Sequence, residues 1–165
     1  MSEENVEVVR RVGEAWNESG FQGVIEQGLL HPDIEYHDDR RWPEARSAFG
    51  TAAFLERFEE FLDLLGEDAS ITTEQVLDAG EDQVVVIFRL SGRGRASGIP
   101  HDHRWGYLCR VRDGKVHFMQ AYLEPQEALE AAGCRSRRFR RRTWEVRGVA
   151  SNMESVGVST DLFQV

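Results

Sequence analysis

The sequence predicts an α+β domain in which N-terminal helices pack against a curved antiparallel sheet. Apolar residues recur at helical spacing in the first third of the chain and alternate with polar residues from residue 70 onward. An Asp-Gly pair at 113–114 joins two alternating runs, which is typical of a tight β-hairpin. Because the strands follow the helices, we expect a meander that wraps around them as a cone.

Composition favours one soluble, globular domain. The chain has 165 residues, of which 41% are hydrophobic and 30% charged. No apolar run approaches the roughly 18 residues of a membrane span, and the acidic N-terminus does not look like a secretory signal. The two cysteines form no disulfide framework. We therefore expect a cytoplasmic protein that does not bind membranes.

The helices are expected in the following places. Val6, Val9, Val12 and Trp16 have helical spacing, and this first helix ends near Gly20. A shorter helix near 21–30 precedes a strand at 34–38. Thr51 is expected to cap a helix with a wide apolar stripe, formed by Phe54, Leu55, Phe58, Phe61, Leu62 and Leu65.

The second half of the chain reads as strands. Alternation with a period of two predicts them at 70–78, 83–95, 100–112 and 115–124. Pro125 begins a short helix that stops at Gly133.

The turn at Asp113-Gly114 fixes which strand residues share a face, provided that the register continues without interruption. One face then carries Val111, Val116, Cys109, Phe118, Tyr107, Gln120, Trp105, Tyr122, His103 and Glu124. It is aromatic with polar groups at its far end, as small-molecule pockets are. The expected ligand-binding residues are Tyr36, Phe88, Trp105, Phe118 and Gln120; the alternative is that these aromatic residues are ordinary core.

The other face of the hairpin is mixed in character. Its Leu108, Met119 and Leu123 suit a partly apolar contact with a second subunit, which favours a homodimer.

Asp38 is the leading candidate for a catalytic group. In the stretch HPDIEYHDD, strand alternation places Asp38 on the same face as Ile34 and Tyr36. One hypothesis makes it a general base that removes a proton next to a carbonyl group, with Tyr107, Tyr122 or His103 as the donor.

A structural reading of the same acids is that they hold a turn. Asp38 and Asp39 would then accept backbone N–H groups in the loop, or pair with Arg40 and Arg41. A third reading is ligand binding without chemistry.

A metal site is not expected. His101 and His103 share a strand face, but His117 falls on the opposite one. A site would need an outside acid such as Glu124, without any dedicated ligand spacing. We expect no cofactor.

Residues 5–133 resemble the SnoaL-like group of the nuclear transport factor 2-like superfamily. The matching stretches are NVEVVRRVGEAWN, HPDIEYHDD, FGTAAFLERFEEFL, DQVVVIFRLSGRGRASG, VRDGKV and PQEALEAAG. The resemblance implies the nuclear transport factor 2-like (cystatin-like) roll over residues 1–133, a bacterial source and a homodimer. Relatives include ketosteroid isomerases, polyketide cyclases, epoxide hydrolases and proteins without catalysis, so the fold alone does not define the activity.

The resemblance transfers only part of an active site. It places Asp38 at the position of the proton-moving Asp of ketosteroid isomerases. The family's Tyr donor falls at Val12, and its protonated Asp falls near Gly106 or Tyr107. The base is kept and the donor pair is lost, which argues against a true ketosteroid isomerase.

The C-terminal segment 134–165 differs from the body. It carries seven arginines and three acidic residues, whereas the whole chain has a net charge of −9. The acidic body argues against nucleic acid as a partner. The segment itself could be a poorly ordered extension, a strap on the acidic body, or an arm for an anionic partner or nucleic acid.

The sequence thus predicts a pocket for a small apolar or carbonyl-containing molecule. The enzyme hypothesis is an isomerase or cyclase reaction without a cofactor. The alternatives are a non-catalytic binding or accessory module and an interaction protein that uses the tail.

Overall fold

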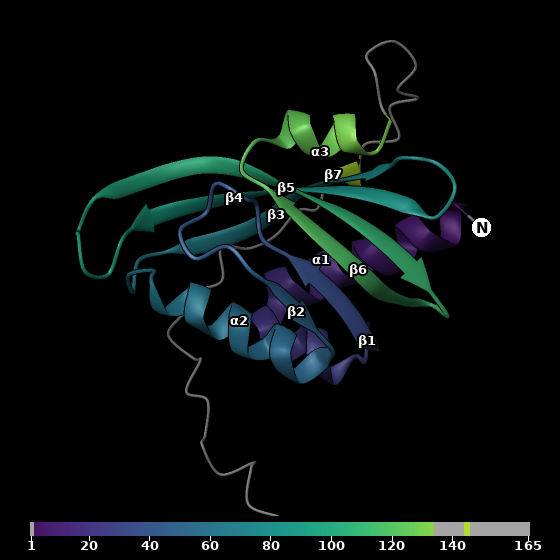
Figure 1. Ribbon diagram of the computed structural model, residues 1–165, viewed down its shortest axis with the longest axis horizontal. Coiled ribbons are helices and arrows are strands. Elements are labelled where there is room, and N and C mark those ends of the chain that lie inside the picture. Colours follow the sequence, from purple (N-terminus) through teal and green to yellow (C-terminus); the bar gives the residue numbers. More distant parts are fainter. Residues whose placement is uncertain (1, 134–143, 146–165) are drawn as a thin grey trace, which may run out of the picture.

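A curved sheet of seven strands forms the body of the protein, in the order β2-β1-β6-β5-β4-β3-β7 (Figure 1). The computed structural model describes residues 2–133 and 144–145, so most of the predictions for the tail lie outside the described residues. The elements are α1 (Ser2–Glu26), β1 (Leu30–His37), β2 (Ser47–Phe49), α2 (Thr51–Asp63), β3 (Ser70–Asp78), β4 (Gln83–Arg93), β5 (Pro100–Arg112), β6 (Lys115–Tyr122), α3 (Pro125–Ala131) and β7 (Trp144–Glu145).

The predicted α+β class and the helix-then-strand order are confirmed. The strands at 70–78 and 100–112 have the predicted bounds, and two others end two residues early, at Arg93 and Tyr122. The meander is antiparallel, but β1 lies parallel to β6. No helix among the described residues is long and apolar enough to cross a membrane.

Two glycines with positive φ mark helix boundaries. Gly20 has φ 60° and ψ −147°, which breaks α1 at the predicted place. The cap of α2 is Gly50, with φ 82°, and not Thr51 as predicted. The Thr51 hydroxyl instead donates to the carbonyl oxygen of His31, at 3.3 Å.

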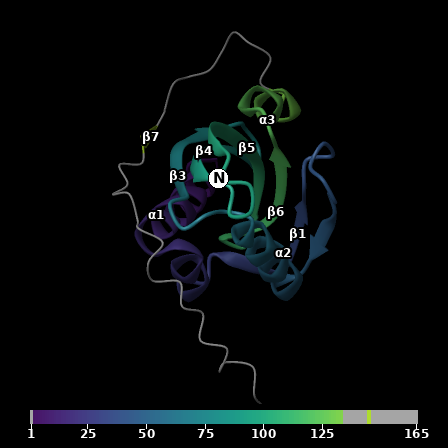
Figure 2. The ribbon, with the colours of Figure 1, turned by 90° about the vertical axis from the view of Figure 1, so that its left-hand side faces the viewer.

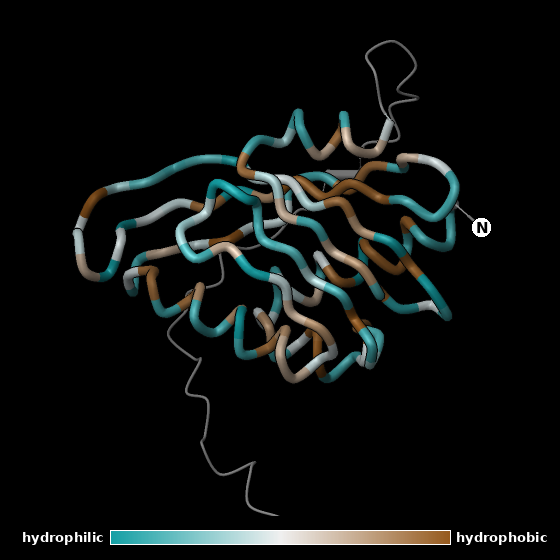
Figure 3. The backbone as a smooth tube through the Cα atoms, viewed as in Figure 1, coloured by the Kyte–Doolittle hydropathy of each residue, from teal (hydrophilic) through white to brown (hydrophobic). Residues whose placement is uncertain are grey.

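The two faces of the sheet are covered by different helices (Figure 2). α1 and α2 fill the concave face and bury the main core, whereas α3 packs on the convex face over Leu108 and Val85. α3 can approach closely because a Cβ on Gly106 would lie 2.7 Å from the Ala128 Cβ. Figure 3 shows the hydrophobic residues along the central strands and along one side of α2.

The β5–β6 hairpin contains an irregularity that the sequence did not predict. The turn is of the expected type, with φ 53° at Asp113 and 68° at Gly114, and Val111 faces Val116. Beyond this pair, Arg110 faces Phe118, so His117 is one extra residue in β6.

This bulge moves every following side chain of β6 to the other face. Cys109 faces Met119 and Tyr107 faces Ala121, and these four side chains are buried in the core. The prediction that Phe118, Gln120 and Tyr122 share the inner face is therefore wrong.

The three residues assigned to the subunit contact do not form one exposed face of the hairpin. Leu108 lies in the small cluster beneath α3. Met119 belongs to the main core, and Leu123 packs against it. Leu108 and Met119 are buried by the protein's own chain and Leu123 is half-buried, and the homodimer remains a prediction.

Candidate functional site

Asp38 directly follows the C-terminal end of β1, and three donors hold its carboxylate. The Tyr36 hydroxyl donates to Oδ1 at 3.0 Å. The Arg57 Nε at 2.8 Å and the Arg46 backbone N–H at 3.0 Å both donate to Oδ2. The Asp38 N–H donates in return to the Arg46 carbonyl oxygen, at 3.1 Å. The acid therefore closes the base of loop 38–46 and forms a buried ion pair with α2.

Arg57 is the site residue that sequence reasoning missed. Its side chain is 8% exposed and that of Asp38 is 7% exposed, so both charges are largely removed from water. The sequence did indicate that Arg57 is buried, because it lies three residues after Phe54 and four before Phe61. Helical spacing places it on the apolar stripe of α2, where an unpaired charge would be costly. An arginine there requires a buried acid as its partner.

Two tyrosines extend this polar group into the core. A side-chain hydrogen bond joins Tyr107 to Tyr36, which itself donates to Asp38. Burial raises the pKa of Tyr36 and of Tyr107 well above the usual range. Both hydroxyls therefore keep their protons near neutral pH. We refer to Tyr36, Asp38, Arg57 and Tyr107 as the Asp38 network.

Asp39 performs the turn function that the sequence analysis offered as the structural alternative. Its carboxylate accepts the Arg41 N–H at 2.9 Å and the Leu123 N–H at 2.9 Å. The Arg41 guanidinium forms a two-pronged contact at 3.0 and 2.7 Å and also pairs with Glu127 of α3. Asp39 thereby fastens loop 38–46 to the end of β6 and to α3.

Two internal cavities adjoin the Asp38 network. One of about 20 Å³ is lined by the network together with Trp42, Phe61, Trp105 and Leu123, among others. It has room for about one water molecule. The other, of about 80 Å³, lies within the cone and is almost wholly apolar. Tyr107 is part of both walls.

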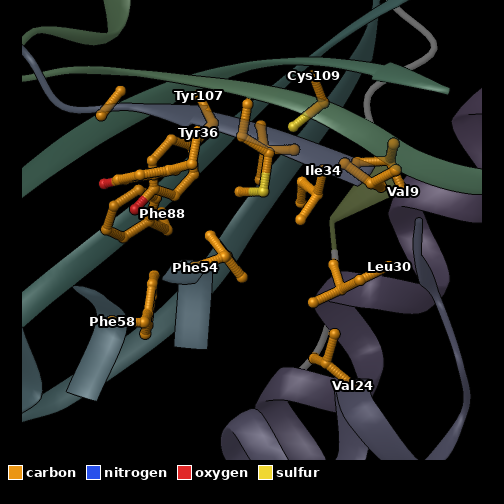
Figure 4. Packing of buried hydrophobic residues seen from close by; sticks show 14 of the residues in the cluster. Val9, Val24, Leu30, Ile34, Tyr36, Phe54, Phe58, Phe88, Tyr107 and Cys109 are labelled. Carbon is orange, nitrogen blue, oxygen red and sulfur yellow. The ribbon is translucent and has the colours of Figure 1, made fainter. Parts of the chain in front are cut away.

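The larger cavity runs through the cluster shown in Figure 4. There Tyr36, Tyr107 and Phe88 lie together at one end, with Cys109 and Val9 toward the other. The Phe88 ring stacks on Tyr107 with a centroid distance of 4.9 Å. Of the residues predicted to bind ligand, Phe88 lines this apolar cavity, whereas Tyr36 and Trp105 line the small one.

Other predicted site residues lie elsewhere. His103 lines an open surface groove, and its ring stacks on Trp105 at 5.4 Å. Tyr122 packs against the cluster beneath α3. Phe118 lies beneath the Arg110 guanidinium at 5.0 Å. Gln120 donates its amide N–H to the Asp38 carbonyl oxygen at 3.1 Å, so it supports the loop without lining either cavity.

No group of three or more His, Cys, Asp or Glu side chains among residues 2–133 and 144–145 is placed to hold a metal ion. The cavities are instead lined by hydroxyl, aromatic and aliphatic groups around one ion pair. Both cavities lie inside the cone-shaped α+β fold.

The chain belongs to the SnoaL-like domain family, whose sequence model matches residues 9–119. No curated protein matches the sequence. Among solved structures, Bal32a from a soil-derived mobile gene cassette has a TM-score of 0.61 and 21% identity, over 79% of this chain and 96% of its own.

Two further structures share the fold. An NTF2-like protein from Burkholderia xenovorans LB400 has a TM-score of 0.58 and 23% identity, over 80% of this chain and 97% of its own. TerC, co-crystallised with polyporic acid, has a TM-score of 0.58 and 17% identity, over 79% and 98%. At these identities the likeness establishes the fold alone.

Asp39→Asn should make stability less dependent on pH. Hydrogen bonds from Arg41 lower the pKa of Asp39 well below its usual range. The ionised form therefore adds stability above the unfolded-state pKa of about 4, and this is lost as the pH falls. We expect a loss of about 1–2 kcal/mol at pH 7, since Arg41 is half-exposed.

Urea denaturation at pH 7 and pH 3 measures this effect. The difference between Asp39→Asn and the native protein should shrink at pH 3. An equal difference at both pH values would contradict the assignment.

Arg57→Met should destabilise the protein strongly, because it leaves the Asp38 carboxylate buried without its partner. The expected loss in the free energy of unfolding is about 3–5 kcal/mol. The double variant Asp38→Asn/Arg57→Met should lose less than Arg57→Met alone. Arg89→Met breaks the half-exposed pair with Asp102 and is the control, with an expected loss of at most about 1 kcal/mol. Equal losses for Arg57→Met and Arg89→Met would refute a structural role for the buried pair.

Proposed function

We infer that the protein binds a small, mainly apolar molecule inside the cone and does not transform it. The bound group would occupy the apolar cavity and contact the Tyr107 hydroxyl, which lies at the polar end of the cavity. The observation that carries this proposal is an apolar cavity that adjoins the Asp38 network, whose carboxylate is already held by three donors.

The cavity is costly to maintain without a ligand. Natural cores contain few voids larger than a water molecule. An unfilled cavity destabilises a core by about 24 cal/mol per Å³, or about 2 kcal/mol for the 80 Å³ found here. A penalty of this size supports a binding role over incidental packing.

The walls of the cavity suit an apolar group. Its lining is almost entirely carbon. Burial raises the pKa of the Cys109 thiol to about 12, so this group remains neutral. Tyr107 is the one tyrosine in the wall. Its proton is used in the bond to Tyr36, so its oxygen offers an acceptor to a donor group of the ligand.

The Asp38 network favours binding over proton transfer. A carboxylate has about four lone-pair positions, and three of those on Asp38 are occupied. A general acid works best when its pKa is near the working pH, whereas burial raises the pKa of Tyr107. The co-crystallisation of TerC with polyporic acid supports small-molecule binding in this fold.

An isomerase is the second candidate, because the Tyr107–Tyr36–Asp38 chain places a carboxylate next to the cavity. In that reaction Asp38 would take a proton from the carbon beside a carbonyl group and return it to the far end of the double bond. Its remaining lone-pair position on Oδ1 is where the proton would go.

Binding is tested by xenon titration followed by ¹²⁹Xe NMR, since dry apolar cavities take up xenon. Cys109→Leu should fill the cavity and weaken xenon binding by about tenfold or more. Cys109→Ala enlarges the same cavity and should strengthen binding, which makes it the matched control. Equal xenon binding by all three proteins would refute the proposed site.

Catalysis is tested with 3-cyclohexen-1-one, whose isomerisation to the conjugated 2-cyclohexen-1-one is followed by ultraviolet absorbance. No acceleration over buffer is expected from the native protein or from Asp38→Asn. Turnover that is lost in Asp38→Asn would replace the binding proposal with the isomerase.

A further inference from the structure

We propose that the surface groove beside Trp42 is the outer half of the binding site, and that it takes the uncharged polar end of an elongated ligand whose apolar end fills the cone. This inference rests on the proposed binding function. It names both the class of ligand and the residue that divides the site.

The inner cavity is too small to hold a whole ligand. Its 80 Å³ is about half the volume of an engineered cavity that accepts benzene, and ligand pockets usually measure about 300–1,000 Å³. The open groove has about 860 Å³ and lies within that range. A ligand of ordinary size therefore needs both spaces.

Shared wall residues show that the groove, the 20 Å³ cavity and the apolar cavity are adjacent. Trp42 and Leu123 line both the groove and the 20 Å³ cavity. Tyr107 lines both the 20 Å³ cavity and the apolar cavity. The proposed path from solvent to the interior runs past Trp42, through the 20 Å³ cavity, and past Tyr107.

Trp42 is a part of this wall that lies on a loop. It is half-buried in loop 38–46, and its ring packs edge-on against Phe61 at 5.8 Å and Trp105 at 5.2 Å. The loop itself is held by Asp39, which accepts the N–H groups of Arg41 and Leu123. A rotation of the Trp42 side chain opens the path while the loop backbone stays in place.

The inner face of this wall offers a donor to a ligand. Trp105 is only 6% exposed, and its buried indole N–H has no hydrogen-bond partner among the residues that the structure describes. Buried polar groups are nearly always paired, so an acceptor is expected near it. A ligand oxygen in the space next to Trp105 would meet this need.

The groove favours a polar end without net charge. Its lining holds two cations, Arg89 and Arg104, and two anions, Asp102 and Glu124. Arg89 forms a two-pronged pair with Asp102 at 2.7 and 2.6 Å, and Arg104 pairs with Glu74 at 2.6 Å. Burial lowers the pKa of His103, which is therefore neutral near pH 7. Paired charges of both signs suit a hydroxylated group, which both donates and accepts.

The test measures association of 1-heptanol, a slim alkyl chain that ends in a hydroxyl, with the native protein and with Trp42→Ala. Stopped-flow fluorescence of the remaining tryptophans reports binding. Trp42→Ala should raise the association rate constant about tenfold, because the ring no longer has to move aside. Phe49→Ala removes an exposed aromatic side chain from β2 and is the control, with an unchanged rate.

Two comparisons complete the experiment. Heptanoate, which has the same chain length and a charged end, should bind more weakly than the alcohol to the native protein. Leu123→Ala thins the same wall and should also accelerate binding. It replaces Trp42→Ala in the test if that variant does not fold.

The possible results separate failure of the groove, of the ligand class and of the binding function. If xenon enters the cavity but Trp42→Ala and Leu123→Ala bind the alcohol at the native rate, the groove is not part of the site and the binding function stands. If the alcohol binds none of these proteins, the proposed ligand class is wrong. If xenon fails to bind the native protein, the binding function itself fails.

Discussion

The buried ion pair between Asp38 and Arg57 is the interaction on which the polar end of the cone depends. It joins the end of β1 to the middle of α2, and the second Oδ2 contact, from the Arg46 N–H, closes loop 38–46. Because Tyr36 donates to the same carboxylate, the pair also orients the tyrosines. A group with so many structural partners acts as a framework for the pocket. The ligand would then be recognised by the groups that this framework positions.

The sequence predicted the regular elements well, since periodicity is a local property. The strands at 70–78 and 100–112 have the predicted bounds, and the Asp-Gly turn has positive φ at both positions. The bulge at His117 has no corresponding pattern in the local sequence. Either register places a large apolar residue inside, Phe118 in one and Met119 in the other. Only packing against the rest of the core selects between them.

The candidate site was predicted in part for the same reason. Strand alternation placed Tyr36 and Asp38 on the inner face, and both are found there. Arg57 could have been inferred from its helical spacing within the apolar stripe of α2. Trp42 could not, because contacts from Asp39 to the distant Leu123 backbone set the course of its loop. Such contacts between separate segments have no signature in a local pattern.

The single extra residue in β6 affects how this protein can be compared with others. A sequence alignment that carries β6 through His117 without a gap would match Gln120 and Tyr122 with cavity-lining residues of a relative that lacks the bulge. It would likewise match Met119 and Ala121 with that relative's surface. Functional residues transferred along this strand by sequence alone would be one position out of phase. Comparisons of this strand therefore need the pairing of β5 with β6 as their reference.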